Sequence, residues 1–148
     1  MIPYSRQLID GKDIKTVIKT LKSDLVTTGP KVPEFEKKIK NFLGVKYCVA
    51  VNNGTSALHL VMMAIGLKPG DEVLTPSFTY IATCEVIALL QLKPIFVEVD
   101  PDTFTIDIDD ACSKVTPKTK AIVIAKQFTA KNLGISEKKI FLRKIKDQ

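Results

Sequence analysis

The sequence predicts an α/β fold with a mostly parallel sheet that helices cover on both faces. Along the chain, the hydrophobic pattern switches regularly between a helical period of about 3.6 residues and short continuous apolar runs. Each apolar run has the length of a strand, and each is followed by a helical pattern. Continuous apolar strands are typical of a parallel sheet that is buried on both sides.

Two amphipathic helices are predicted before the first strand. The first, residues 10–24, begins at a possible N-cap, Asp10. It places four apolar side chains on one helical face: Ile14, Val17, Ile18 and Leu21. Residues 27–33, "TTGPKVP", are expected to form a loop because they concentrate glycine and proline. Residues 34–44 form the second predicted helix, which ends at Gly44.

Strands and helices then alternate to the end of the apolar pattern. The sequence predicts four central strands, at residues 46–52, 72–75, 94–98 and 120–124. Helical patterns occupy the intervals between them, at residues 56–67, 80–92 and 107–115. The connections are short, as expected for strand–helix units packed in one layer structure.

Length and composition limit the class of protein. At 148 residues and 45% hydrophobic content, the chain can bury one sizeable core, and the pattern indicates a single domain. No apolar run reaches the ~18 residues of a membrane span, and residues 1–15 lack the apolar centre of a signal peptide. We therefore expect a soluble cytoplasmic protein that does not bind membranes.

The net charge of +6 is concentrated near the end of the chain. Residues 1–125 contain 15 basic and 14 acidic residues, whereas residues 126–148 contain 7 and 2. A solvated basic face on a short terminal helix accounts for this pattern, and no basic stripe with interleaved aromatics indicates nucleic-acid binding. The three cysteines, Cys48, Cys84 and Cys112, are widely separated, which predicts buried thiols and neither disulfides nor a metal site.

A cluster of small polar residues, "NNGTS", lies between the first predicted strand and the helix that follows. In an open parallel sheet, ligands bind beyond the carboxyl ends of the strands. A helix N-terminus also offers free N–H donors, so Gly54, Thr55 and Ser56 suit a phosphate group. The stretch matches neither a Walker P-loop nor a Rossmann fingerprint. A helix capped by Thr55 or Ser56 without any ligand is the alternative.

Two aromatic residues follow the second predicted strand. The segment "TPSFTYIAT" presents Phe78 and Tyr80 at the same rim of the sheet. An aromatic ring beside a phosphate site suits a flat heteroaromatic cofactor, because stacking fixes the plane of the cofactor ring. Core packing of both rings is the alternative.

Several motifs in order along the chain resemble one known family. They are "TTGP", "NNGTSAL", "GDEVLTPSFTYIAT" and "VEVDPDTFTID". The sequence is similar to the N-terminal part of the DegT/DnrJ/EryC1/StrS sugar aminotransferases, which are pyridoxal-phosphate enzymes of fold type I. The resemblance runs from about Ile2 to Val123 and implies a partial three-layer sandwich over residues 1–123, equivalent to the N-terminal half of the large domain.

The resemblance assigns roles to individual residues. It implies that Gly54, Thr55 and Ser56 hold the phosphate of pyridoxal phosphate and that Tyr80 stacks on its pyridine ring. It also places Thr28 and Gly29, in the loop between the first two helices, near a sugar-nucleotide substrate.

Two other polar residues are expected to be structural. Asp100, in "DPDTF", fits a turn and capping residue better than a catalytic group. His59, the only histidine, lies in an apolar helical run and is expected to be a structural imidazole with its hydrogen bonds satisfied.

The resemblance also implies a reaction. Glutamate is expected to donate its amino group to the cofactor, which then aminates the keto group of a nucleotide-linked deoxysugar, in a site completed across a homodimer. A Schiff-base lysine and an aspartate at the pyridinium nitrogen carry this chemistry in the family. They lie in motifs resembling S-F-x-x-x-K and E-D-A-A-H-A, and neither motif occurs in this sequence. No catalytic residue is therefore assigned here.

After "TKAIV", the sequence departs from the family pattern. We expect residues 124–148 to be a divergent basic tail with a short helix, produced by a truncation, a frameshift or an engineered end. Lys126 and Lys131 lack the flanking residues of the Schiff-base motif. Three functions therefore stay open: an aminotransferase fragment, a related dehydratase with histidine in place of the lysine, and a non-catalytic remnant that binds a partner subunit.

Overall fold

The computed structural model describes residues 6–125 and 142–144. The chain divides into two compact units, Met1–Ala50 and Val51–Gln148. The boundary falls inside residues 1–123, and the assignment of these residues to one aminotransferase domain stays a prediction.

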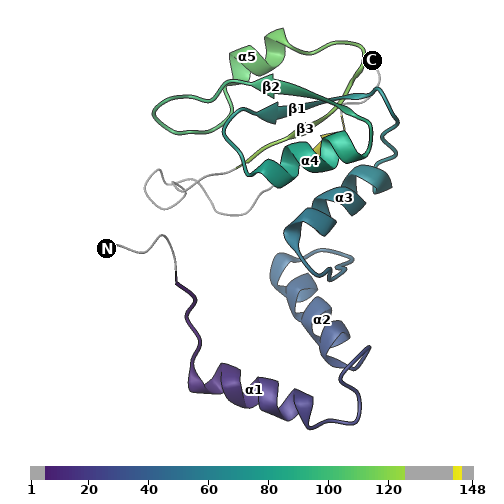
Figure 1. The fold of residues 1–148 in the computed structure, drawn as a ribbon, viewed down its shortest axis with the longest axis vertical. Helices are drawn as coiled ribbons and strands as arrows, with labels where there is room; N and C mark the ends of the chain where they lie inside the picture. Colours follow the sequence, from purple (N-terminus) through teal and green to yellow (C-terminus); the bar gives the residue numbers. More distant parts are fainter. Residues whose placement is uncertain (1–5, 126–141, 145–148) are drawn as a thin grey trace. The chain divides into compact units, whose positions relative to one another are not determined.

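The first helix of the N-terminal unit, α1, spans Gly11–Leu21 (Figure 1). Its predicted cap is confirmed, because Asp10 Oδ1 accepts hydrogen bonds from the Lys12 and Asp13 amides at 2.7 and 3.0 Å. Asp13 Oδ2 in turn accepts from the Asp10 amide at 3.0 Å. This reciprocal capping box satisfies donors that the start of a helix leaves unpaired.

Helix α2 spans Lys31–Leu43, so it begins three residues before the predicted start. The prediction that residues 31–33 belong to a loop is wrong. Pro33 lies in the first turn of the helix, where a missing N–H removes no intrahelical hydrogen bond. The predicted end is confirmed at Gly44, whose φ of +66° is a left-handed conformation that favours glycine.

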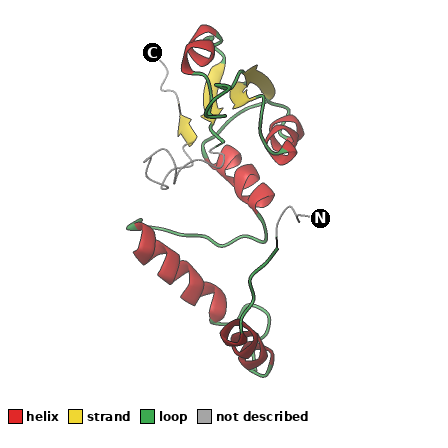
Figure 2. Ribbon diagram, turned by 90° about the vertical axis from the view of Figure 1, so that its left-hand side faces the viewer, coloured by secondary structure: helices red, strands yellow, loops and turns green. Residues whose placement is uncertain are grey.

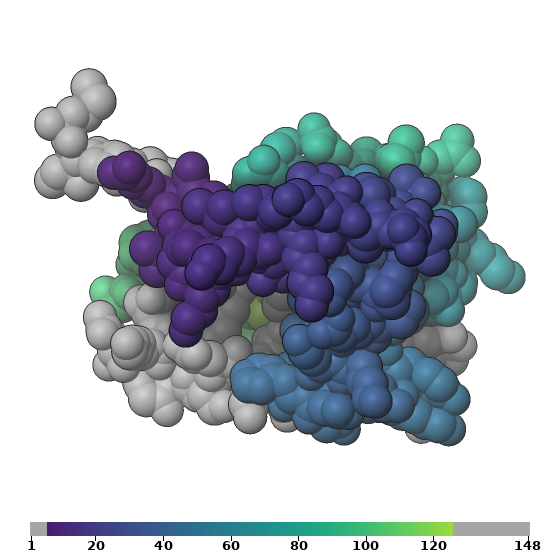
Figure 3. Space-filling model, turned by 90° about the horizontal axis from the view of Figure 1, so that it is seen from below, coloured from purple at the N-terminus to yellow at the C-terminus, as the bar shows by residue number. Residues whose placement is uncertain are grey.

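Neither α1 nor α2 buries a side chain among the described residues. The four apolar residues predicted on one face of α1 are between 46% and 62% exposed: Ile14, Val17, Ile18 and Leu21. Figure 3 shows the purple and blue surface of this unit. Its helices therefore keep apolar area that the unit itself does not cover.

The strand predicted at residues 46–52 is wrong, because these residues form no strand in the structure. A strand is defined by ladder hydrogen bonds to a neighbour, and no strand among the described residues pairs with this segment. One backbone amide instead bonds to a side chain, since Ala50 N donates to Glu36 Oε1 at 2.8 Å. The segment has strand composition without a strand partner.

The C-terminal unit contains a four-stranded sheet. Its strands are β1 (Glu72–Pro76), β2 (Lys93–Val97), β3 (Thr119–Val123) and β4 (Leu142–Lys144), in the order β2-β1-β3-β4. β1 pairs in parallel with both β2 and β3, and β4 pairs antiparallel with β3. The three predicted strands that match β1, β2 and β3 are confirmed within one residue at each end. Within the predicted basic tail, residues 124–148, the structure describes five residues: 124 and 125 have no regular secondary structure, and 142–144 form β4. The short helix expected in this tail is not among them, and residues 126–141 and 145–148 lie outside the described residues.

Helices pack on both faces of this sheet, which confirms the predicted α/β layers (Figure 1). α3 (Gly54–Ala64) and α4 (Ile81–Leu89) contribute to one core, and α5 (Ile108–Ser113) contributes to the other. The first core contains Met62, Val73, Val86, Ile87, Leu92, Ala121 and Val123. The second contains Leu74, Val97, Ile106 and Ala111. Neighbouring residues Val73 and Leu74 of β1 enter opposite cores, as the alternation of a strand requires. Figure 2 shows the same elements by type.

The cysteines differ from their predicted burial. Cys48 and Cys84 are half-buried, and Cys112 is exposed. The short helix α5 buries only Ala111, so its neighbour Cys112 points away from the core. Burial, followed by the nearby Glu85 carboxylate, raises the pKa of the Cys84 thiol.

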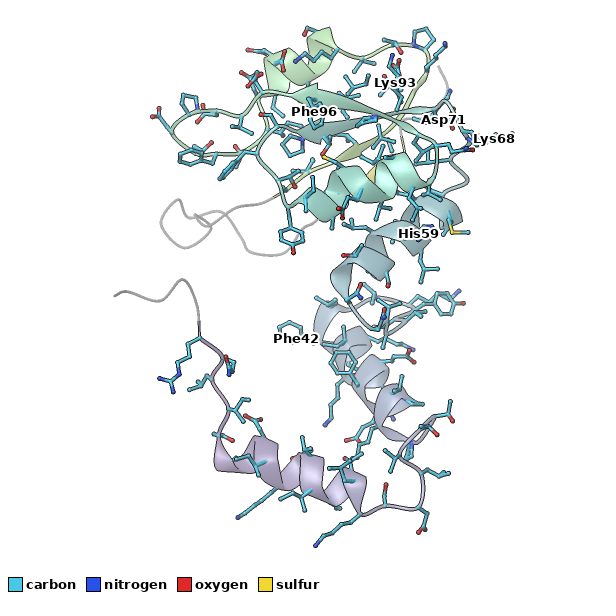
Figure 4. The ribbon with its side chains drawn as sticks, in the orientation of Figure 1. Phe42, His59, Lys68, Asp71, Lys93 and Phe96 are labelled. Carbon is cyan, nitrogen blue, oxygen red and sulfur yellow. The ribbon has the colours of Figure 1, made fainter. Side chains whose placement is uncertain are left out.

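A buried carboxylate, Glu72, ties the amino ends of the three parallel strands together. It is 5% exposed. Its Oε2 accepts from Thr116 Oγ1 at 2.5 Å, and its Oε1 accepts from Lys93 Nζ at 3.3 Å. Figure 4 shows Lys93 at the same end of the sheet as Asp71. The hydrogen bond from Thr116, followed by that from Lys93, lowers the pKa of Glu72 against the opposing effect of burial.

We predict that Glu72→Gln destabilises the C-terminal unit and removes part of its pH dependence. The folded-state pKa of Glu72 lies below the ordinary value of a glutamate side chain, 4.5. The carboxylate therefore stabilises the fold above pH 4.5, and this contribution disappears as the pH falls through the folded-state pKa. Urea denaturation at pH 7 and at lower pH measures the effect, and Glu85→Gln on the exposed side of α4 is the control. Equal unfolding midpoints for Glu72→Gln and the parent at pH 7 would contradict it.

A second prediction concerns the start of α3, where Asn53 Oδ1 accepts a hydrogen bond from the Ser56 amide at 2.8 Å. Replacing this cap by alanine leaves the amide unpaired, so Asn53→Ala should lower the free energy of unfolding by about 1 kcal/mol. Asn52→Ala, one residue earlier, should change it much less. Chemical denaturation of the three proteins measures both effects, and an unchanged Asn53→Ala would show that the cap contributes nothing.

Candidate functional site

A pocket of about 450 Å³ lies between the first turns of α3 and α4. Its lining residues come from these two helices and from the residue before α4: Gly54, Thr55, Ala57, Leu58, Val61, Tyr80, Ala82 and Thr83. The structure thus brings together three of the four residues predicted to bind a cofactor. The volume lies within the range of small-molecule sites, ~300–1,000 Å³.

The N-terminus of α3 forms one side of this pocket. The residue that caps this helix is Asn53. The alternative that Thr55 or Ser56 caps the helix is therefore wrong. The cap occupies the Ser56 amide, and Ser56 is absent from the pocket lining. The amides of Gly54 and Thr55 have no hydrogen-bond acceptor among the described residues. Two donors therefore remain at the positive end of the helix dipole.

Gly54 leaves open space beside its backbone. A Cβ built on Gly54 would meet no atom within 4 Å. The residue does not have a positive φ, so its backbone conformation does not require glycine. Neither packing nor backbone conformation within the described chain thus explains why this position lacks a side chain. A ligand that approaches the backbone closely would explain it, because the absent side chain leaves room for the ligand.

Tyr80 precedes α4 and is 77% exposed, so its ring is available at the rim of the pocket. Phe78 does not join it. The Phe78 ring packs on Phe104, with a centroid distance of 5.6 Å and an interplanar angle of 48°. Phe78 is not among the residues that line this pocket, and its ring has a partner in the loop after β2.

Two buried threonines lie near the carboxyl end of β1 and the start of α4, and one of them, Thr83, lines the pocket. Thr83 is 5% exposed, and its Oγ1 lies 3.3 Å from Thr79 Oγ1. Thr75, near the carboxyl end of β1, is fully buried, and its Oγ1 has no partner among the described residues. A buried hydroxyl without a partner is unfavourable. Polar groups thus gather where ligands of parallel sheets bind.

The sequence reasoning missed most of the apolar wall of the pocket. Ala57, Leu58 and Val61 follow Gly54 at intervals of three and four residues, which places them on one face of α3. This spacing could have predicted that the three side chains lie on the same face of the helix as Gly54. Thr83 gave no comparable signal, because its contribution depends on how α4 packs against α3.

Thr28 and Gly29 lie in the loop between α1 and α2, in the N-terminal unit and outside the pocket lining. Thr28 has a φ of +50°, a strained conformation for a β-branched residue. A Cβ on Gly29 would collide with the Leu25 carbonyl oxygen. The chain's own backbone therefore requires glycine at this position.

Two polar residues, Asp100 and His59, were predicted to be structural. The prediction is confirmed for Asp100, whereas the hydrogen bonds expected for His59 are not found among the described residues. Asp100 is confirmed as a turn residue, because its Oδ1 accepts from the Thr103 amide, the Thr103 hydroxyl and the Asp102 amide at 2.7, 3.0 and 3.0 Å. The Thr103 hydrogen bonds lower its pKa most. His59 is half-buried on α3 and lies outside the pocket lining (Figure 4). No described residue is hydrogen-bonded to its imidazole.

The structure also bears on two other kinds of site. Within residues 6–125 and 142–144, no group of three or more histidine, cysteine or acidic side chains could hold a metal ion. Among the same residues, no helix has both the length and the apolar character needed to cross a membrane.

Known proteins resemble this chain in sequence. The UDP-2-acetamido-2-deoxy-3-oxo-D-glucuronate aminotransferase of Pseudomonas aeruginosa is 50% identical over 95 residues, which are 64% of this chain and 26% of that protein. The UDP-4-amino-4-deoxy-L-arabinose–oxoglutarate aminotransferase of Shewanella sediminis is 40% identical over 122 residues, which are 82% and 31%. The chain thus spans about a quarter to a third of the length of these relatives.

Solved structures share its fold. Spr1654 from Streptococcus pneumoniae in its PLP form matches with a TM-score of 0.77 and 38% identity, over 82% of this chain and 31% of that one. Pyridoxal phosphate is the cofactor of these proteins and of their family.

The family model of the DegT/DnrJ/EryC1/StrS aminotransferases matches residues 7–129, six residues beyond the end of the resemblance found in the sequence. This match covers most of the chain, and the relatives and the fold agree with it. The chain belongs to the DegT/DnrJ/EryC1/StrS aminotransferase family.

Proposed function

We propose that this chain forms the N-terminal part of a pyridoxal-phosphate-dependent aminotransferase that acts on a nucleotide-linked keto-deoxysugar. The observation that carries the proposal is the pocket between α3 and α4, which combines open space at Gly54 with the exposed ring of Tyr80. The open space at Gly54 can hold a phosphate group, and the ring of Tyr80 can stack on a flat cofactor ring.

The phosphate would bind at the start of α3. The Gly54 and Thr55 amides offer two donors, and the hydroxyls of Thr55 and Ser56 offer two more groups. Because the Ser56 amide is held by Asn53, we assign Ser56 to the phosphate through its side chain alone. The helix dipole adds a favourable interaction with the negative charge.

The cofactor ring would lie along the apolar wall of the pocket. Tyr80 would stack on the ring, and Ala57, Leu58 and Val61 would exclude water from its other contacts. When bound, pyridoxal phosphate acts as an electron sink during transfer of an amino group. The residues of this chain bind and orient the cofactor.

The substrate would meet the loop that contains Thr28 and Gly29. The positive φ of Thr28 supports this assignment, because strained backbone is concentrated at functional sites. We expect glutamate as the amino donor and a cytoplasmic homodimer as the complete enzyme. The lysine and aspartate motifs that carry the remaining chemistry do not occur in these 148 residues.

A second candidate function is a dehydratase of the same family. A GDP-4-keto-6-deoxymannose-3-dehydratase with a trapped PLP-glutamate geminal diamine matches this chain with a TM-score of 0.77 and 30% identity, over 82% of this chain and 33% of that one. Proteins named for both reactions therefore share this N-terminal part of the fold. A reading frame that continues into an S-F-x-x-x-K motif would favour the aminotransferase, and a histidine at the lysine position would favour the dehydratase. A frame that does not continue would favour a non-catalytic remnant.

We predict that pyridoxal phosphate and inorganic phosphate bind weakly and noncovalently at the start of α3. Titration to millimolar ligand should shift the NMR amide resonances of residues 53–57. Gly54→Val should abolish these shifts because a branched side chain fills the open space, whereas Thr55→Ala should weaken binding by only about 1 kcal/mol.

A matched control for this titration is Gly11→Val at the start of α1, where a Cβ also meets no atom within 4 Å. This variant should bind like the parent. If the amides of residues 53–57 do not respond in a folded sample, the phosphate site is not functional in this chain.

We also predict that the purified 148-residue chain has no transaminase activity. Without the lysine that bonds the cofactor covalently, the rate should fall by many orders of magnitude. The assay combines glutamate, a keto-sugar nucleotide and pyridoxal phosphate, and a reaction with the cofactor alone is the control. Turnover above that control would refute the prediction.

A further inference from the structure

We propose that Thr83, in the first turn of α4, binds the ring of the cofactor through its hydroxyl group. The hydroxyl forms a hydrogen bond with a polar group on the edge of the ring, either the pyridine nitrogen or the phenolic oxygen. This proposal rests on the function proposed above, because it concerns the same pocket between α3 and α4. It adds a residue to which the sequence motifs assign no role.

Thr83 is the buried polar side chain of the pocket lining. Three lining residues carry a polar side chain: Thr55, Tyr80 and Thr83. Thr55 and Tyr80 are exposed, whereas Thr83 is 5% exposed. The other lining residues are glycine, alanine, leucine and valine. The Thr83 hydroxyl therefore lies in an apolar environment, where a hydrogen bond to a ligand is electrostatically stronger than in water.

The Thr83 hydroxyl has only a weak partner among the described residues. Its Oγ1 lies 3.3 Å from Thr79 Oγ1, and no other hydrogen bond to this hydroxyl is found there. Hydrogen bonds between hydroxyl groups are usually about 2.5–3.0 Å long. The hydroxyls of Thr16 and Thr20 on α1, by contrast, donate to carbonyl oxygens at 2.9 and 3.0 Å. Because a hydroxyl donates one hydrogen bond and accepts two, Thr83 can bind a further partner.

The position of Thr83 fits the part of the cofactor that the phosphate does not anchor. The phosphate would bind to the amides of Gly54 and Thr55 at the start of α3. Thr83 belongs to α4, which packs beside α3 (Figure 1). Its amide donates to the Tyr80 carbonyl oxygen at 3.0 Å. A ring stacked on Tyr80 thus lies within one helical turn of Thr83.

A hydrogen bond from Thr83 would make the pocket selective among aromatic phosphates. Phosphate binding and stacking do not distinguish a pyridine ring from a benzene ring, because both rings offer a flat π face. A buried hydroxyl does distinguish them, since a ring without polar groups leaves the hydroxyl unpaired in the complex. The pocket should therefore bind a hydroxypyridine phosphate more tightly than a benzyl phosphate.

Three ligands separate the contributions of the phosphate, the flat ring and the polar ring edge. They are inorganic phosphate, benzyl phosphate and pyridoxamine phosphate, which has no aldehyde that could react with lysine side chains. NMR titration of the full 148-residue chain measures the three affinities through the amides of residues 53–57. The parent should bind pyridoxamine phosphate most tightly.

Thr83→Val removes the hydroxyl and keeps the branched shape of the side chain. It should weaken the binding of pyridoxamine phosphate about three- to tenfold, and it should not weaken the binding of benzyl phosphate or inorganic phosphate. Thr83→Ser restores a hydroxyl and should bind pyridoxamine phosphate like the parent. Thr119→Val removes another buried threonine hydroxyl, outside the pocket lining, and should change none of the three affinities.

The 3-deoxy analogue of pyridoxamine phosphate identifies the polar group that Thr83 contacts. If the partner is the phenolic oxygen, Thr83→Val should bind this analogue as tightly as the parent does. If the partner is the pyridine nitrogen, Thr83→Val should still bind it more weakly.

Circular dichroism establishes that each variant is folded. The Thr83 methyl resonance of the parent provides a measurement that needs no variant, because it should shift with pyridoxamine phosphate and not with inorganic phosphate. A loss of affinity that is confined to pyridoxamine phosphate in Thr83→Val, and that Thr83→Ser reverses, supports the proposal.

Two results overturn the proposal while the phosphate site itself persists. One is an equal affinity of Thr83→Val and the parent for pyridoxamine phosphate. The other is an equal loss of affinity for all three ligands, which would show that Thr83 only maintains the shape of the pocket. If the folded parent binds none of the ligands, the proposed function fails, and the role of Thr83 fails with it.

Discussion

The parallel pairing of β1 with β2 on one side and β3 on the other is the constraint on which the described C-terminal unit depends. Every residue of β1 is buried, and its side chains enter both hydrophobic cores. Parallel neighbours need crossover connections, so α4 and α5 must return the chain across the sheet. Glu72 adds a polar anchor, because its carboxylate contacts the start of β2 and the turn before β3.

This constraint also fixes the place of the candidate site. Parallel strands bring their carboxyl ends to one edge, and the loop after β1 leads from there into α4. Tyr80 reaches the pocket because it ends that loop, and Gly54 reaches it because α3 packs beside α4. The same geometry leaves Thr75 as a buried hydroxyl without a partner near the end of β1.

The N-terminal unit is held by local interactions. The capping box of α1 and the ion pairs of Glu34 with Lys31 and Lys38 join residues that lie three or four positions apart. The hydrogen bond from Ala50 to Glu36 is the longer-range polar contact described in this unit. Local bonds of this kind shape helices but cover little apolar surface, which explains why α1 and α2 keep exposed apolar faces.

The sequence by itself determined the elements whose causes are local. The start of α1 follows from the cap at Asp10, and the end of α2 follows from Gly44. Three of the four predicted strands follow from short apolar runs. Each of these signals acts over a few residues. Family membership also followed from the sequence, because the order of several motifs carries it. The cofactor residues Gly54, Thr55, Ser56 and Tyr80 were named from the same motifs and stay a proposal.

Tertiary structure decided whatever depends on a partner distant in sequence. Residues 46–52 have strand composition but form no strand, since a ladder needs a neighbour that composition does not supply. Phe78 and Tyr80 are two residues apart, yet one packs on Phe104 and the other lines the pocket. Asn53 and not Ser56 provides the cap of α3, because side-chain geometry at the helix start selects the acceptor. Local sequence preferences thus determine where a helix or strand can form, and long-range packing determines which other residues it contacts.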